Sequence, residues 1–189
     1  MKRLAIFISL HLFLFLLVIA YQAQAQAEEE EWSIDRYETL SYARVSGEVT
    51  HGDNLNFWIR AQDNCDKVYN TFTVYTYEKP GDIKQLLNKN IPIKLNGADI
   101  TASVQDISPF LMGYRVHLSL GSYPIKEYIY FLKEFYDEFQ KYEIEIVVGL
   151  DFKAAKYFDV QINSWKLDKL VPSVLEAHKK CKQIDNVDS

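Results

Sequence analysis

Glycine and proline are scarce in this sequence, with seven and five among 189 residues, and the glycines occur singly. A phosphate-binding loop needs several glycines within a few residues, so that backbone N–H groups can approach the anion. No such loop is present, and we expect no nucleotide site. No stretch rich in proline, glycine and serine divides the chain, which indicates a single domain.

Recognisable metal and catalytic motifs are lacking as well. The sequence contains no His-Glu-x-x-His, no Cys-x-x-Cys and no acidic calcium loop, and neither cysteine has a second ligand at zinc-like spacing. The Gly-x-Ser-x-Gly elbow of many hydrolases is missing too. We therefore expect no metal and no cofactor, and the sequence favours a protein that is not an enzyme.

Net positive charge is another absence. The chain has 21 basic and 26 acidic residues, and two of the basic ones, Lys2 and Arg3, lie in the predicted signal peptide. Without them the net charge is −7. Nucleic acids and anionic lipid surfaces bind proteins through concentrated basic residues. We expect neither as a partner.

The N-terminus predicts export. Lys2 and Arg3 precede an apolar run over residues 4–20, and two Ala-Gln-Ala triplets follow at residues 23–27. This is the pattern of a signal peptide over residues 1–25, with cleavage after Ala25 or after Ala27. An uncleaved anchor is the alternative, although 17 residues is short for a membrane span. We expect a periplasmic or secreted protein whose mature chain has no transmembrane anchor.

Only two cysteines are present, Cys65 and Cys181, and both follow the signal. Exported proteins fold in oxidising compartments, where an even number of cysteines favours pairing. We predict a disulfide between them. Such a bridge would join the end of an early strand to the last helix.

The rest of the chain divides by composition. Residues 28–31 are four glutamates, so residues 28–41 are predicted to be an acidic, partly disordered lead-in. A single globular domain is expected over residues 42–182. Residues 183–189 are expected to form a flexible tail.

Apolar residues alternate with polar ones in most of the domain, which is typical of half-buried strands. Strands are expected near residues 43–50, 55–60, 72–77, 114–120, 144–150 and 158–162. The clearest hairpin spans residues 91–104, where Asn96-Gly97 suits a type I′ turn. Its register should place Ile93 opposite Ile100.

Two segments have helical periodicity instead, residues 124–141 and 167–181. We predict an α+β fold in which two amphipathic helices pack on a mostly antiparallel or mixed sheet of about seven or eight strands. The strand–helix–strand order over residues 114–150 also suggests a crossover between parallel strands.

Histidines are the natural candidates for catalysis. His117 shares a predicted strand face with Arg115 and Ser119, which makes these three residues weak candidates for a hydrolytic site. No sequence feature brings a carboxylate to His117, so a solvent-facing strand residue is the simpler interpretation. His51 precedes a turn signature, and His178 lies where a cation would cap the last helix.

Aromatic residues are abundant, at 14% of the chain. Trp58 and Arg60 share one strand face, and Tyr75 and Tyr77 lie opposite Val74 on another strand. These four residues are the candidate binding platform, because Trp, Tyr and Arg are enriched at interface hot spots. The alternative is that a helix covers this face.

These observations leave three classes of function. The first is an exported, non-enzymatic binding or inhibitor-type module that acts on an envelope or extracellular protein or glycan. The others are a structural component of an envelope complex and a small secreted hydrolase with its site near His117.

The export hypothesis predicts a defined mature N-terminus. When the full chain is expressed in a host with a signal peptidase, the exported protein should begin at Gln26, or at Glu28 if cleavage follows Ala27. Intact-mass spectrometry of the exported fraction measures this. An exported protein that keeps Met1 would show instead that the segment is an anchor.

Overall fold

The computed structural model describes residues 32–50, 52–141, 143–148 and 153–184. The chain divides into two compact units, and the described residues belong to the second, Trp32–Ser189. The predicted signal peptide, the acidic residues 28–31, His51 and most of the predicted tail therefore lie outside the described residues.

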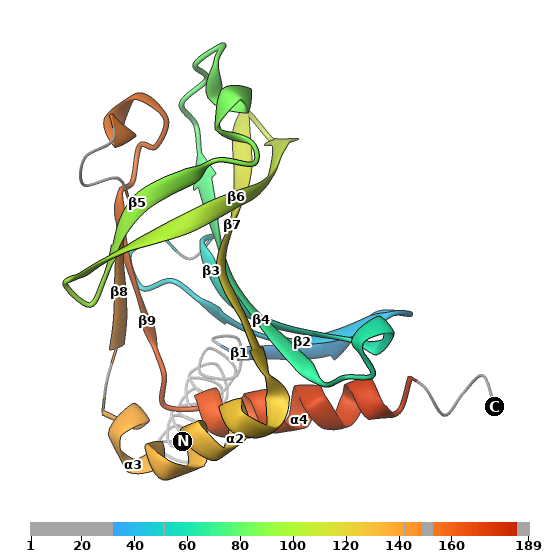
Figure 1. The fold of residues 1–189 in the computed structure, drawn as a ribbon. Helices are drawn as coiled ribbons and strands as arrows, with labels where there is room; N and C mark the ends of the chain where they lie inside the picture. The colour runs from blue at the N-terminus through green and yellow to red at the C-terminus, as the bar shows by residue number, and fades with distance from the viewer. Residues whose placement is uncertain (1–31, 51, 142, 149–152, 185–189) are drawn as a thin grey trace, which may run out of the picture. The chain divides into compact units, whose positions relative to one another are not determined.

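The described residues form nine strands and three α-helices, in the chain order drawn in Figure 1. The elements are β1 (Trp32–Arg36), β2 (Leu40–Ser46), β3 (Asn54–Arg60), β4 (Lys67–Thr76), β5 (Asn90–Leu95), β6 (Ala98–Phe110), β7 (Gly113–Pro124), α2 (Ile125–Glu134), α3 (Tyr136–Phe139), β8 (Glu143–Val148), β9 (Ile162–Lys166) and α4 (Leu170–Lys182).

A single sheet contains all nine strands, in the order β1-β2-β3-β4-β7-β6-β5-β8-β9. Every strand pairing among the described residues is antiparallel. The predicted α+β class and antiparallel sheet are confirmed, with nine strands rather than seven or eight. The suggested parallel crossover is wrong, because β7 and β8 are not neighbours and each pairs with antiparallel strands.

The globular domain begins earlier than the sequence predicted. Residues 32–36 form β1, which pairs with β2 from Trp32 opposite Val45 to Arg36 opposite Ser41. The lead-in predicted over residues 28–41 therefore includes a full strand, whose Trp32 packs on Phe57 of β3 with ring centroids 6.2 Å apart. The last strand was also misplaced: residues 154–156 form a 3-10 turn, and β9 starts at Ile162.

The β5–β6 hairpin forms as predicted. Ile93 lies opposite Ile100, and Ile91 lies opposite Ala102. Asn96 and Gly97 have φ angles of 47° and 81°, the left-handed conformations that a type I′ turn requires. Local turn chemistry and the apolar pattern thus specify the same register.

The predicted helix over residues 124–141 is interrupted. It ends at Glu134, Phe135 has φ −102° and ψ 18°, and the short α3 begins at Tyr136. The last helix runs over Leu170–Lys182 rather than 167–181, with Pro172 in its first turn, where the missing N–H is tolerated. Three helices therefore replace the predicted two.

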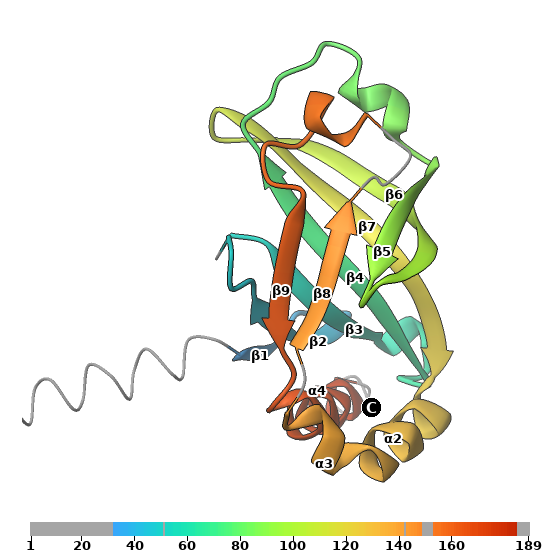
Figure 2. The same cartoon turned by 90° about the vertical axis from the view of Figure 1, so that its left-hand side faces the viewer.

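The sheet is strongly curved, and the helices lie at one end of its concave side (Figures 1 and 2). Alternate residues of β2 and β3 point inward, among them Ala43, Leu55 and Phe57, and α4 packs on β1, β2 and β3. The Ser41 hydroxyl donates a hydrogen bond to the Ala177 carbonyl oxygen at 2.6 Å. Small side chains on β2 thus allow α4 to approach the sheet closely.

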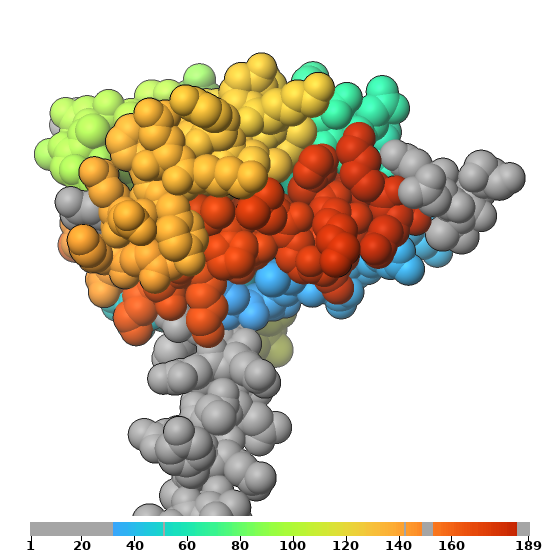
Figure 3. All heavy atoms as spheres, turned by 90° about the horizontal axis from the view of Figure 1, so that it is seen from below, coloured from blue at the N-terminus to red at the C-terminus, as the bar shows by residue number. Residues whose placement is uncertain are grey.

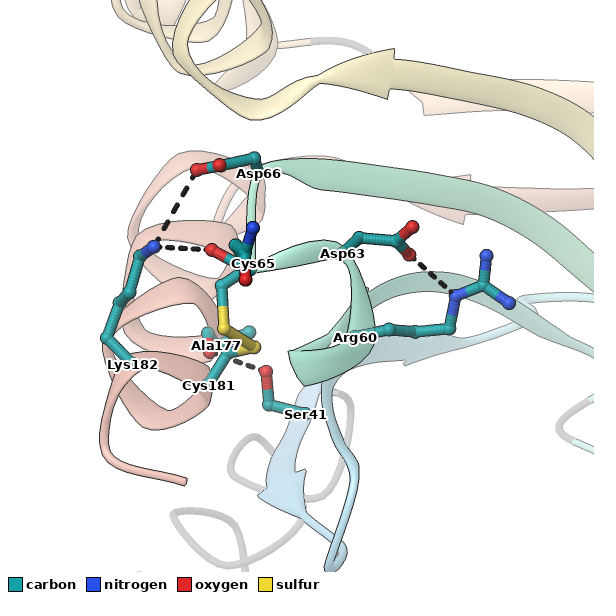
Figure 4. The surroundings of a disulfide bond; sticks show 9 residues. Ser41, Arg60, Asp63, Cys65, Asp66, Ala177, Cys181 and Lys182 are labelled. Carbon is teal, nitrogen blue, oxygen red and sulfur yellow. Dashed lines mark hydrogen bonds and ion pairs between the residues drawn. A yellow bond between two sulfur atoms is a disulfide. The ribbon is translucent and has the colours of Figure 1, made fainter. Parts of the chain in front are cut away.

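The predicted disulfide joins Cys65 to Cys181, with both cysteines fully buried (Figure 4). It ties the turn before β4 to the last turn of α4. Beside it, the Lys182 ammonium forms an ion pair with Asp66 at 3.6 Å. The bridge therefore fixes the end of the helix that packs across the concave face.

None of the helices in the described part of the chain is long and apolar enough to cross a membrane.

Removing the bridge should destabilise the protein substantially. The two cysteines are 116 residues apart, and closing so long a loop destabilises the unfolded chain by about 5 kcal/mol in the chain-entropy model. Replacing both cysteines by serine should therefore lower the free energy of unfolding by about 2–5 kcal/mol. Urea unfolding followed by tryptophan fluorescence measures this. An unchanged midpoint would show that the bridge contributes nothing.

Candidate functional site

The predicted aromatic platform lies on the outer face of the sheet. Leu55, Phe57 and Ile59 point inward toward the helices, so Trp58 and Arg60 point outward. The described helices α2 and α4 pack on the other side. The outer face is thus exposed because the described helices cover the opposite face of the sheet.

Trp58 is half-buried on this face and packs against Tyr42, with ring centroids 5.2 Å apart. Its indole N–H donates to the Thr71 hydroxyl at 2.9 Å. The Arg44 guanidinium lies 4.7 Å from the Tyr42 ring centroid and 5.6 Å from that of Trp58. Trp58 therefore has internal partners for both its ring and its N–H.

Arg60 is engaged in the same way. Its guanidinium lies 3.9 Å from the Tyr69 ring centroid, and its Nε atom donates to Asp63 at 3.0 Å. Asp63 also accepts a hydrogen bond from the Tyr69 hydroxyl at 2.9 Å. Arg60 thus belongs to a local cluster that closes the turn after β3.

The two tyrosines of the predicted platform lie elsewhere. Trp58 is opposite Tyr69, and Tyr75 is six residues further along β4, about 20 Å away. Tyr75 packs against Phe110 at 4.6 Å between ring centroids, and Tyr77 follows the end of β4 and is 61% exposed. The structure therefore separates the four candidates into two pairs, Trp58 with Arg60 and Tyr75 with Tyr77, at opposite ends of the strands.

His117 lies on the outer face as predicted, inside a polar chain that crosses four strands. Arg44 Nε donates to Asn56 Oδ1 at 2.8 Å, and Asn56 Nδ2 donates to the Thr73 hydroxyl at 3.2 Å. That hydroxyl is 3.1 Å from His117 Nδ1. Desolvation first, and then the nearby Arg115 charge, lower the pKa of His117.

The tertiary structure supplies a carboxylate that the sequence did not reveal, since Asp106 on β6 is opposite His117 on β7. Ser119 does not complete a triad, because its hydroxyl accepts a hydrogen bond from the Gly121 N–H at 3.2 Å. Arg115 is opposite Tyr75 and Ser108 instead. The three weak catalytic candidates thus share a face, but among the described residues the hydroxyl that is hydrogen-bonded to His117 is that of Thr73 and not that of Ser119.

His178 does not suit the role of a helix-capping cation. Burial first, and then the Lys182 charge, lower its pKa, and its Nε2 atom has no hydrogen-bond partner in the described part of the chain. Within that part, acidic, histidine and cysteine side chains form no group of three that would hold a metal ion.

The concave side holds a feature that the sequence did not predict, an apolar cavity of about 860 Å³. This volume is within the range of small-molecule sites, about 300–1,000 Å³. The cavity lies between the sheet and the helices, and its wall is mainly aliphatic and aromatic. Prominent wall residues are Leu55 and Phe57 of β3, Leu120 of β7, and Tyr128, Phe131 and Leu132 of α2.

The cavity opens to solvent beside α2. Its deep wall includes Leu55 and Leu132, which are 2% and 1% exposed, whereas Tyr123 and Phe131 are each 47% exposed. Leu95 and Ile100 of the β5–β6 hairpin form the facing wall. Figure 3 shows that hairpin, in lime green, beside the yellow and orange α2–α3 segment, while α4 lies alongside α2.

Asn70 is a polar residue in this apolar wall. It lies on the inward face of β4 between Val68 and Phe72, opposite Phe57 of β3. The β4–β7 register shifts next to it, where Asn70 is opposite Gly121 and Thr71 is opposite Ser119. Leu120 is the extra residue of this bulge, and bulges often re-aim side chains at functional sites.

Tyr128 adds a second polar group to the wall. Asn70 Nδ2 donates to the Tyr128 hydroxyl at 3.4 Å, whereas Asn70 Oδ1 is buried and has no hydrogen-bond partner in the described part of the chain. The Tyr128 ring packs on Tyr123 at 5.7 Å between centroids. Burial raises the pKa of Tyr128 far above its usual value, so its hydroxyl stays protonated.

The sequence does not reveal this site, for a specific reason. The apolar stripe of α2 and the alternation of β3 are visible in the sequence, but both patterns are equally typical of a filled core. The one available signal was Asn70, because a polar residue interrupts the inward row of Val68, Phe72 and Val74. It was not recognised, since β4 was predicted to begin only at residue 72.

A buried carboxyl lies where the β2–β3 loop meets β9, the last strand in the sheet order. Asp53, which is 2% exposed, accepts hydrogen bonds from the Tyr75 N–H at 2.8 Å and from Asn163 Nδ2 at 3.1 Å. Asn163 of β9 also accepts from the Val49 N–H, so the β2–β3 loop is joined to the last strand. Desolvation raises the pKa of Asp53 to about 6 despite these hydrogen bonds.

The chain is thus an α+β protein built on a curved antiparallel sheet with an apolar cavity beneath its helices. Comparison with protein-family models, curated proteins and solved structures finds no match. The function must therefore be argued from the geometry of the site itself.

Stability should depend on pH through Asp53. Its folded-state pKa is about 6, above the ordinary value of 3.8, so the folded state binds more protons between these values. The free energy of unfolding should therefore fall by about 2 kcal/mol as pH rises from about 4 to about 6, out of about 3 kcal/mol over the whole transition, and this contribution should level off above about pH 7.

Asp53→Asn should remove this dependence, because the amide does not ionise. Urea unfolding of both proteins between pH 4 and pH 7 measures the difference. Asp99→Asn is the matched control, since the Asp99 side chain is 79% exposed near the start of β6. If Asp53→Asn keeps the wild-type profile, the buried carboxyl is not the titrating group.

Proposed function

We propose that this protein is an exported, non-enzymatic binding module whose ligand occupies the apolar cavity between the curved sheet and α2. The cavity is the observation that carries the proposal. It has a volume of about 860 Å³ and a wall made mainly of aliphatic and aromatic side chains. Transfer of apolar ligand surface from water into such a site is favourable by about 25 cal/mol per Å².

The arrangement of the wall supports binding rather than a purely structural core. Tyr123, just before α2, and Phe131, within α2, both line the cavity and are each 47% exposed. Large aromatic side chains exposed around the mouth of an apolar cavity are typical of ligand sites. A closed core would bury them.

The outer face gives less support to the other hypotheses. Trp58 and Arg60 already have ring and hydrogen-bond partners within the chain. Around His117, the hydroxyl of Ser119 is bonded to a backbone N–H instead of the imidazole. A protein or glycan partner at Trp58 and hydrolysis at His117 remain predictions of the sequence.

Export is part of the proposal and rests on two features. Residues 1–25 have the pattern of a signal peptide. Cys65 and Cys181 form a disulfide, and structural disulfides are typical of proteins that fold outside the reducing cytosol. An exported module with an apolar cavity is suited to shielding a poorly soluble ligand from water.

The proposal predicts saturable binding of an uncharged apolar fluorophore such as N-phenyl-naphthylamine. Leu120→Trp should weaken that binding by about tenfold or more, because the larger side chain would occupy part of the cavity. Fluorescence titration of the purified mature chain measures both affinities.

Ile162→Trp is the control for this experiment. Ile162 is 48% exposed on β9 and does not line the cavity, so the same added indole should leave the affinity unchanged. Absence of saturable binding to the wild-type chain, or equal weakening by both substitutions, would overturn the proposal.

A further inference from the structure

We infer that the ligand is an uncharged amphiphile whose alkyl chain lies in the apolar cavity and whose polar head both accepts and donates a hydrogen bond at Tyr128 and Asn70. This inference rests on the proposed function and adds the chemical class of the ligand. Long-chain alcohols, monoacylglycerols and primary fatty amides have such heads.

The first argument is the acceptor that Asn70 leaves unused. Asn70 belongs to the cavity wall, and its Oδ1 atom is buried without a hydrogen-bond partner among the described residues. A buried polar atom without a hydrogen-bond partner costs folding free energy. A ligand hydroxyl or amide that donates to Oδ1 would recover that free energy, and a purely apolar ligand would not.

The second argument is the donor on Tyr128. Its hydroxyl oxygen accepts from Asn70 Nδ2, which leaves its own proton to donate, and no described residue accepts it. Burial keeps this group protonated by raising its pKa. One unused acceptor and one unused donor therefore lie on neighbouring side chains, as a head with both functions requires.

The charge of the cavity wall also favours an uncharged head. Glu127 is the one ionisable acid or base in the described cavity wall besides the tyrosines, and it is exposed on α2. An anionic head would find no lysine, arginine or histidine in that wall and would approach the Glu127 carboxylate. A cationic head placed at Asn70 would lose its hydration, which is costly without a paired charge.

The position of the polar pair also fits an amphiphile. Tyr128 contacts the exposed Tyr123 on one side and the buried Phe57 on the other, with ring centroids 5.7 and 6.5 Å apart. The head would therefore lie between the solvent side and the deep wall. Leu95, Ile100 and Ile144 supply apolar surface for the chain on the facing side of the cavity.

The test compares ligands that share one alkyl chain and differ only in the head. Lauryl alcohol, laurate and laurylamine would each displace the bound fluorophore from the mature chain at pH 8, below their micellar concentrations. Lauryl alcohol should have an affinity at least about tenfold higher than that of laurate or of laurylamine. Laurate or laurylamine binding as tightly as the alcohol would overturn the inference.

Substitutions at Tyr128 and Asn70 test where the polar head of the ligand binds. Tyr128→Phe and Asn70→Leu should each weaken lauryl alcohol binding by roughly three- to tenfold, the effect of one lost hydrogen bond. Their affinity for the fluorophore is measured in parallel, and the loss for lauryl alcohol should exceed the loss for this ligand, which has no such head. Tyr130→Phe is the matched control, because Tyr130 is 69% exposed on the same helix and does not line the cavity.

The outcomes separate the two proposals. If the wild-type chain binds the fluorophore but Tyr128→Phe and Asn70→Leu bind lauryl alcohol as well as Tyr130→Phe does, the head-group inference fails and the binding function stands. If the wild-type chain binds neither the fluorophore nor any lauryl ligand, the proposed function itself fails.

Discussion

The rest of the structure depends on the polar junction that joins the β2–β3 loop to β9. Asn163 bonds to Asp53, to the Val49 N–H and to the Thr50 carbonyl oxygen, and the Glu48 N–H donates to the Ser164 carbonyl oxygen. Gly47 makes room for it, since a Cβ atom there would lie 2.3 Å from Asn163 Nδ2. These bonds hold β9 against β2 although six strands separate them in the sheet order.

Curvature of the sheet creates an interior that the strands alone do not fill. α4 fills one part of it, fixed by the Cys65–Cys181 bridge and by the close approach of Ala177 to Ser41. α2 covers another part, but it ends at Glu134 and leaves Phe131 and Phe135 partly exposed. The cavity is the space that remains between the sheet, α4 and the less deeply buried α2.

The polar side chains on the inner face of the sheet differ in whether their buried atoms have hydrogen-bond partners among the described residues. Asp53 and Asn163 satisfy each other across the junction, as buried polar groups usually do. Asn70 interrupts an otherwise apolar row and leaves Oδ1 without a partner, next to a bulge at Leu120. Proteins tend to break local rules where function requires it, and Asn70 is such a position beside the cavity.

The sequence by itself determined the features that depend on local chemistry. The Asn96-Gly97 turn and the register of its hairpin follow from φ preferences and alternation, and the two amphipathic segments follow from their period. The pairing of Cys65 with Cys181 followed from there being only two cysteines. Trp58 and Arg60 were also correctly placed on one strand face, although Tyr75 lies at the other end of the sheet.

Only the tertiary structure decided where the candidate site lies. Alternation shows which side chains of β3 point inward, but the same pattern suits a filled core and a cavity wall. Whether Leu55 and Phe57 meet a helix or a void depends on sheet curvature and on where α2 packs and ends, at the break at Phe135. The meeting of Asn70 with Tyr128, 58 residues later in the chain, likewise exists only after β4 and α2 have packed together.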